Sequence, residues 1–296
     1  MTNKPYKLAL IQMRCSPDPA LSLAKAEKML RQAAAEGAKV ACLPELFLTD
    51  YFCQGLDIKK FDLAEKIPGK TTDTLGSIAR ETGMVIIGSV YEKAAAGLHY
   101  NTATITDSNG ELVGIYRKMH IPHDPLFEEK YYFAPGDLGF KAHDTSAGRL
   151  GALVCWDQWY PEGARLTAMQ GADILFYPTA IGWHPAEKAQ YGKSQVEAWE
   201  TIQRSHAIAN GVFVASVNRV GLEVTVGDGI EFFGHSFIAD PFGRILAMGS
   251  HDKEEIVSAE INPELIEQTR CNWPFFRDRR VDAYSCITSR WITDNR

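Results

Sequence analysis

The sequence predicts a layered α/β fold built as one continuous domain. Short apolar runs alternate with segments of helical periodicity along the whole chain, and no low-complexity stretch divides it. Hydrophobic residues make up 45% and charged residues 23%, as in ordinary globular proteins, and 296 residues are enough to bury a sizeable core. We therefore expect residues 1–296 to form a single domain. Residues 270–296 are polar and aromatic without a clear period, and should form a C-terminal tail that either packs on a neighbouring subunit or lies on the surface.

The first half of the chain alternates strands with helices and then forms a hairpin. Helices are predicted over 20–36 and 72–82, where apolar residues recur at helical spacing and a glycine, Gly37 or Gly83, follows. Strands are predicted over 6–13, 40–43, 84–91, 101–106 and 111–116. The last two strands flank the turn sequence Asp-Ser-Asn-Gly at 107–110, which indicates a hairpin.

The second half continues the same alternation. Helices are predicted over 161–170, which starts with a proline suited to a first turn, and over 194–210, which Gly211 closes. Strands are predicted over 150–155, 173–177, 212–217, 235–239 and 244–248.

Charge and cysteine usage exclude several classes of protein. The net charge is −6 and there is no run rich in lysine and arginine, which argues against a nucleic-acid partner. No 18-residue apolar stretch could span a membrane, and the N-terminus lacks the features of a signal peptide, so we expect a cytoplasmic protein. The six cysteines show no CxxC pair or zinc spacing and should be free thiols.

Two strand ends carry charged residues suited to catalysis. Glu45 follows the buried run 40–43, at the carboxyl end of a strand, where α/β proteins place ligands. Burial there suits a general base, although a backbone N–H could equally satisfy this carboxylate. Lys118 follows the strand 111–116 and could hold its ammonium over a developing oxyanion. The alternative is a solvated basic pair with Arg117.

Cys155 lies between the predicted strand 150–155 and the predicted helix 161–170. Such strand-to-helix turns present nucleophiles, and the backbone N–H groups that follow can bind an oxyanion. A free thiol needs a neighbouring base or cation to react at neutral pH, and Glu45 and Lys118 could supply both. The alternative is a buried structural cysteine.

These three motifs, Leu-Pro-Glu, Tyr-Arg-Lys-x-His and Cys-Trp-Asp-x-x-x-Pro-Glu in this order, resemble the nitrilase superfamily of carbon–nitrogen hydrolases. The resemblance runs from residues 8–12 to residues 273–274. It implies a four-layer α-β-β-α sandwich of the nitrilase type. Such proteins commonly pair through their helices, so we expect a homo-oligomer.

Within the superfamily the sequence is similar to N-carbamoylputrescine amidases. The segments that carry this similarity are 120–122, 129–137, 178–183 and 234–239. Two positions depart from those relatives: position 123 is histidine where aspartate is usual, and position 127 is phenylalanine where many carry tyrosine. Both lie on a loop expected to border the pocket.

The resemblance implies a role for each site residue. Cys155 is the nucleophile, and Glu45 takes its proton and later activates water. Lys118 stabilises the oxyanion together with the backbone N–H of Trp156, and Glu129 positions Lys118 and the substrate nitrogen. No metal or organic cofactor is needed.

Histidines offer two rival chemistries. His120 and His123 form an H-x-x-H pair, but the H-E-x-x-H helix of zinc hydrolases is absent. A Cys–His protease would use His206 or His235 as its base, but the sequence around Cys155 is unlike that of papain-like proteases.

The charged group that a substrate carries away from its reacting carbonyl distinguishes close relatives within the superfamily. Enzymes that bind a substrate carboxylate carry arginine just after the nucleophile, whereas this chain has Gln158 and Trp159. A distal ammonium instead needs carboxylates or an aromatic face. Residues in suitable segments are Asp124, Glu128, Trp159, Trp183 and Glu187. We therefore expect hydrolysis of N-carbamoylputrescine to putrescine, CO₂ and ammonia. The alternatives are an amidase of the β-ureidopropionase or ω-amidase type, or an inactive member that only binds a partner.

Overall fold

The computed structural model describes residues 4–292, which form two six-stranded sheets and a small third sheet. The first sheet has the order β15 (Glu255–Ile261), β1 (Tyr6–Gln12), β2 (Ala38–Cys42), β3 (Val85–Ala95), β4 (Leu98–Thr106) and β5 (Leu112–Arg117). The second has the order β14 (Ile245–Met248), β13 (Phe237–Ala239), β10 (Phe213–Asn218), β8 (Ile174–Thr179), β7 (Gly148–Ala152) and β6 (Ala142–Thr145). The third pairs β11 (Val220–Glu223) with β12 (Ile230–Phe233) and β12 with β9 (Gly182–Trp183).

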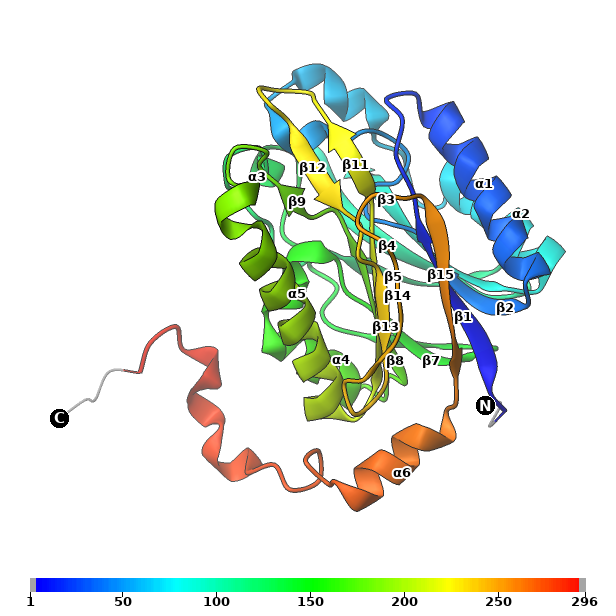
Figure 1. The fold of residues 1–296 in the computed structure, drawn as a ribbon, viewed down its shortest axis with the longest axis vertical. Coiled ribbons are helices and arrows are strands. Elements are labelled where there is room, and N and C mark those ends of the chain that lie inside the picture. Colours follow the sequence, from blue (N-terminus) through cyan, green and yellow to red (C-terminus); the bar gives the residue numbers. More distant parts are fainter. Residues whose placement is uncertain (1–3, 293–296) are drawn as a thin grey trace.

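Helices cover the outer faces of the two large sheets, so the molecule has four layers (Figure 1). Helices α1 (Pro19–Ala35) and α2 (Lys70–Thr82) pack on the first sheet, and α4 (Pro161–Met169) and α5 (Lys188–Asn210) pack on the second. Two further helices, α3 (Glu129–Tyr132) and α6 (Glu264–Asn272), lie outside these layers (Figure 1). The structure confirms the predicted α-β-β-α sandwich.

The central strands are apolar on both faces because each face is covered. On β3, Ile86 packs with the α1 and α2 side chains, whereas Val85 and Ile87 join the core between the sheets. Side chains alternate between the two faces of a strand, so neighbouring residues pack into different cores, one between the two sheets and one under the helices. All three side chains are fully buried. The sandwich therefore fixes the strand ends, where the candidate site lies.

The structure corrects several predicted boundaries, and two of them lie beside the candidate site. Helix α5 begins at Lys188 rather than at residue 194. Gly192 lies inside it because the Trp183 ring leaves little room: an added Cβ would approach Trp183 Nε1 to 3.2 Å. The strand predicted over 150–155 ends at Ala152, and Cys155 begins a 3₁₀ turn instead.

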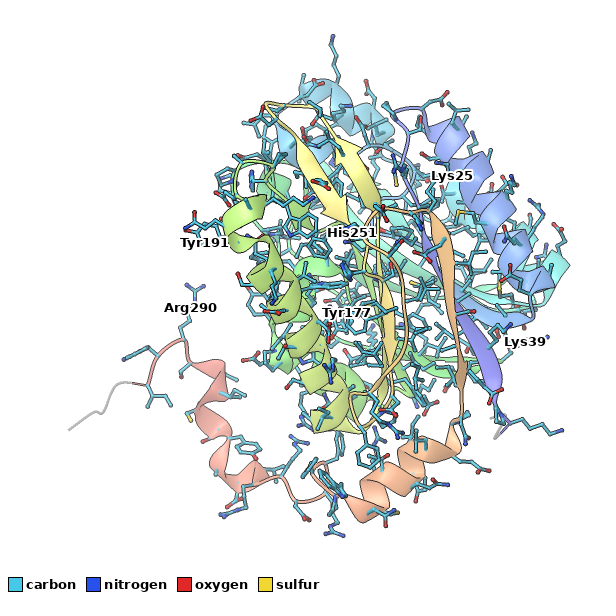
Figure 2. All side chains as sticks on the ribbon, in the orientation of Figure 1. Lys25, Lys39, Tyr177, Tyr191, His251 and Arg290 are labelled. Carbon is cyan, nitrogen blue, oxygen red and sulfur yellow. The ribbon has the colours of Figure 1, made fainter. Side chains whose placement is uncertain are left out.

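The C-terminal segment runs from α6 away from both sheets (Figure 1). The Arg290 side chain projects away from the core (Figure 2), whereas Phe276 packs against it. Large apolar side chains are exposed there, including Trp291 at 81% and Val281 at 68%. Residues 293–296 of the predicted tail lie outside the described part of the chain. Within the described range, no helix combines the length and apolar character needed to span a bilayer.

Candidate active site

Cys155 lies at the bend between β7 and α4, where the chain leaves the second sheet. Its φ of +44° is in the left-handed region that side-chain-bearing residues rarely adopt. The Sγ atom lies 3.7 Å from the carbonyl oxygen of Ala180, which follows β8. This geometry matches the strand-to-helix turn that presents a nucleophile in other α/β enzymes.

The buried carboxylate of Asp157 holds this bend. Its Oδ2 accepts hydrogen bonds from the backbone N–H of Val154 at 2.9 Å and from the Tyr116 hydroxyl at 2.8 Å. Its Oδ1 accepts the backbone N–H of His120 at 3.0 Å and lies 2.7 Å from that ring's Nδ1. Tyr116 and His120 flank Lys118 in the sequence, so Asp157 ties the cysteine turn to the segment that carries Lys118.

Lys118 is fully buried and lies between two carboxylates. Its Nζ is 2.7 Å from Glu45 Oε1 and 2.7 Å from Glu129 Oε2. Burial alone would lower the pKa of Lys118, but the charges of Glu129 and Glu45 outweigh it and hold that pKa well above its usual range. The site therefore contains a permanent ammonium shielded from water.

Glu45 follows the end of β2, as the sequence predicts. Its Oε1 accepts hydrogen bonds from Lys118 and, at 2.6 Å, from Asn101 Nδ2. Its Oε2 is buried and has no hydrogen-bond partner among the described residues. Arg219 also holds this loop, because its Nη2 donates to the carbonyl oxygens of Glu45 and Leu46, each at 2.8 Å.

Glu129 opens α3, and the Tyr51 hydroxyl donates to its Oε1 at 2.6 Å. Burial raises the pKa of Glu129 to about 7 against the lowering effect of Lys118. Burial, followed by the charge of Glu45, also raises the pKa of the Cys155 thiol well above its usual range. The resting thiol is therefore protonated at neutral pH and needs a base when it attacks.

A cavity of about 390 Å³ opens onto Cys155 and Glu129. Aromatic rings form much of its wall, including Trp156, Trp159 and Phe127. The described lining residues include the carboxylates of Asp124 and Glu129 but no lysine or arginine. Glu45 and Lys118 are fully buried and lie outside this lining. The cavity is thus apolar in its walls and acidic in its charges.

The model of the family described as "Carbon-nitrogen hydrolase" matches residues 7–271. The chain belongs to the carbon–nitrogen hydrolase family. This hydrolase is 39% identical over 290 residues to an N-carbamoylputrescine amidase of Solanum lycopersicum, covering 96% of this chain and 95% of that protein. It is 37% identical to a citrullinase of Francisella tularensis, with 96% and 99% covered. The crystal structure of a carbon–nitrogen hydrolase from Helicobacter pylori G27 matches with a TM-score of 0.94 at 43% identity, covering 98% of this chain and 100% of that one.

These comparisons confirm the predicted nitrilase superfamily and its amidohydrolase class of chemistry. The fold of this hydrolase brings together the four residues predicted as catalytic: Glu45, Lys118, Glu129 and Cys155.

The predicted substrate-binding residues of this hydrolase divide into two groups. Asp124, Trp156 and Trp159 line the cavity, with Asp124 exposed at its edge. Trp183 does not line it, because its ring packs on Phe233 and its Nε1 donates to the carbonyl of Gly192. Glu187 is exposed where α5 begins and is also outside the lining. Position in the sequence did not reveal which way these side chains point.

The rival histidines make other contacts. His206 Nε2 lies 2.8 Å from the carbonyl oxygen of Gln158. His235 lies beside Phe233 and His251, and burial lowers its pKa. His120 contacts Asp157, whereas His123 Nδ1 lies 3.0 Å from Glu128, so the two rings of the H-x-x-H pair have different partners.

Sequence reasoning missed Asn101, Tyr51 and Arg219 in the hydrolase site. Asn101 is a polar residue at an inward position of a predicted strand, and that pattern was a usable signal. Tyr51 and Arg219 reach the site through contacts across 78 and 174 residues of sequence, to Glu129 and Glu45. No local sequence pattern indicates contacts between residues so far apart in the chain.

Proposed function

We propose that this hydrolase uses Cys155 to convert N-carbamoylputrescine and water to putrescine, carbon dioxide and ammonia, in the cytoplasm and as a step of polyamine formation from agmatine. The observation that carries the proposal is the buried Lys118 ammonium held between Glu45 and Glu129, beside a cysteine at the base of an acidic, aromatic cavity.

The first half-reaction forms a covalent intermediate. Cys155 Sγ attacks the ureido carbonyl carbon while its proton passes to Glu45. The oxyanion lies near the Lys118 ammonium and the backbone N–H of Trp156. When the tetrahedral species collapses, the terminal C–N bond breaks and the proton on Glu45 leaves with the nitrogen as ammonia. A carbamoyl thioester remains on Cys155.

The second half-reaction uses water. Glu45, now deprotonated, takes a proton from a water molecule as its oxygen attacks the thioester carbon. The carbon–sulfur bond then breaks, and the proton returns to the Cys155 sulfur. The released carbamate decomposes to carbon dioxide and the amine. Glu45 serves as base and acid in turn, while Lys118 keeps its charge throughout.

The cavity favours a substrate with a cationic tail. Asp124 at the cavity edge attracts an ammonium, and the rings of Trp156 and Trp159 offer faces for cation–π contact. A carboxylate would lose hydration and find no guanidinium among the described lining residues. Gln158 does not compensate, because it is fully buried outside the described cavity lining, where its Oε1 accepts from Trp199 and Thr179. Citrulline, which carries a carboxylate beside its ammonium, should therefore be a poorer substrate.

The buried charges also argue against an inactive binding member. The titratable side chains of Glu45, Lys118 and Glu129 are all buried, at a desolvation cost that an apolar core would avoid. A surface used only for binding has no need of them. Their retention beside Cys155 supports catalysis.

The test is a substrate panel on the purified full chain. We expect kcat/KM for N-carbamoylputrescine to exceed that for citrulline, β-ureidopropionate and an ω-amide by at least about tenfold. Asp124→Asn should reduce it several-fold and weaken its salt dependence, because an exposed ion pair contributes up to about 1 kcal/mol. Glu128→Gln, which removes a nearby charge outside the lining, is the matched control. An equal or higher kcat/KM for β-ureidopropionate or citrulline would overturn the substrate assignment.

We also propose that two copies associate through the outer face of α4 and α5 and the tail. Leu166 and Met169 on α4 and Tyr284 and Ile287 on the tail border a shared cavity of about 430 Å³, and each is at least 43% exposed. Met169→Glu should lower the molar mass measured by light scattering, with Leu21→Glu, an exposed position on α1, as the control. An unchanged mass for Met169→Glu would refute this interface.

A further inference from the structure

Asn101 on β4 contacts both charged partners of the candidate site. Its backbone oxygen accepts the backbone N–H of Lys118 at 2.8 Å, and its side-chain Nδ2 donates to Glu45 Oε1 at 2.6 Å. The residue is fully buried, with a side chain on the face of β4 that meets the second sheet, as for Ala103. One residue thus holds both the Lys118 backbone and the Glu45 carboxylate.

The two oxygens of the Glu45 carboxylate are not equivalent as a result. Oε1 accepts from both Lys118 and Asn101, whereas Oε2 is buried and accepts from no described residue. Hydrogen bonds to a charged oxygen stabilise it and make it a weaker proton acceptor. Oε2 is therefore the oxygen available to take a proton.

We propose that Asn101 is a positioning residue that fixes the Glu45 carboxylate so that Oε2 alone serves as the base. The inference rests on the proposed function, in which Glu45 accepts the proton of Cys155. Lys118 Nζ and Asn101 Nδ2 both donate to Oε1. The carboxylate therefore cannot rotate to exchange its two oxygens without losing a hydrogen bond. The proton is then taken at one fixed atom in every turnover.

The orientation of the Asn101 amide follows from its surroundings. The opposite orientation would place its Oδ1 against Glu45 Oε1, two acceptors 2.6 Å apart, so the nitrogen faces Glu45. Oδ1 is consequently buried without a described partner. Burying an unpaired acceptor costs about 1–3 kcal/mol, which leucine at this position would avoid. The sequence keeps the amide despite that cost, as expected if its donor is required.

Removing this donor has a defined signature. The charged form of Glu45 loses one stabilising hydrogen bond, so protonation of the carboxylate becomes easier. The acid limb of the kcat/KM profile should then move to higher pH. A residue that only stabilises the strand would lower the melting temperature and leave this limb in place.

The experiment compares Asn101→Leu and Asn101→Asp with wild type and with Thr104→Val. Thr104 lies on the same strand, is equally buried, and its hydroxyl has no described partner. We expect Asn101→Leu to lose about 10- to 100-fold in kcat, part of what a general base contributes, with KM within about twofold. Its acid limb should rise in pH, while Thr104→Val keeps the wild-type profile.

If Asn101→Leu does not fold, Asn101→Asp tests the same point, because aspartate keeps the shape of the residue. Its carboxyl can donate to Glu45 only when protonated and repels the Glu45 charge when ionised, so its acid limb should also lie at higher pH than that of wild type. Wild-type acid limbs in both variants would overturn the inference. Glu45→Gln separates the two proposals: if it is inactive while both Asn101 variants keep the wild-type profile, only the inference fails. If Glu45→Gln is fully active, the proposed function fails.

Discussion

Replacing Lys118 by methionine removes the ammonium between Glu45 and Glu129 while keeping most of the side-chain volume. Two carboxylates that each lay 2.7 Å from Nζ then face each other without a charge partner. Breaking a buried ion pair in this way costs about 3–5 kcal/mol. For 296 residues the entropy of unfolding is about 0.6 kcal/mol/K, so the melting temperature should fall by about 5–8 °C at pH 8.

The same substitution should remove activity. Loss of an oxyanion donor costs roughly 10² to 10³ in kcat. The disturbed Glu45 adds to this, because like charges close together force one carboxyl to hold a proton. The stability loss should be smaller at pH 5, where protonation relieves the repulsion.

The assay pairs thermal unfolding with ammonia release from N-carbamoylputrescine at pH 5 and pH 8. Lys130→Met is the control, since Lys130 is the exposed neighbour of Glu129 on α3. Equal melting temperatures for Lys118→Met and Lys130→Met at both pH values would refute the assignment of Lys118 as a buried, doubly paired ammonium. Turnover within tenfold of wild type would refute its role at the oxyanion.

Two further predictions concern the other site residues. Cys155→Ala should abolish ammonia release and leave the melting temperature near that of wild type, because only a small side chain at a turn is shortened; residual turnover above background would remove Cys155 as the nucleophile. Glu129→Gln should gain melting temperature relative to wild type between pH 5 and pH 8. The Glu129 carboxyl holds its proton to about pH 7 in the folded state and releases it near 4.5 when unfolded, so wild type loses stability across this window and the glutamine variant does not. Parallel melting curves against pH would contradict that pKa.

Most of the fold follows from local patterns that a sequence displays. The strand predicted over 6–13 is found at Tyr6–Gln12, and the hairpin around residues 107–110 joins β4 to β5. Strand β15 was not predicted, because only two of its seven residues are fully buried and it pairs with β1 across some 250 residues. Helix α5 was predicted too short because Gly192 and the polar residues around it interrupt the apolar periodicity that marks a helix in its first turns.

Some residues of the candidate site could likewise be predicted from local sequence, and others could not. Glu45, Lys118 and Cys155 each sit at a strand end with a recognisable local sequence, so they could be named in advance. Asn101 carries a local signal, a polar residue at an inward strand position, but its partner Glu45 is 56 residues away and no local pattern indicates that contact. Trp183 was expected in the pocket but turns its ring into the core beside Phe233, which only packing decides.

The residues of the site come from both large sheets, and this division controls when the thiol becomes reactive. Glu45 and Lys118 follow strands of the first sheet, whereas Cys155 follows a strand of the second. While the chain is being made, or if the two sheets fail to dock, Cys155 is an ordinary thiol with no base beside it. The complete site therefore requires that the two sheets have docked. In a refolding experiment, the appearance of turnover should therefore report that both sheets have joined.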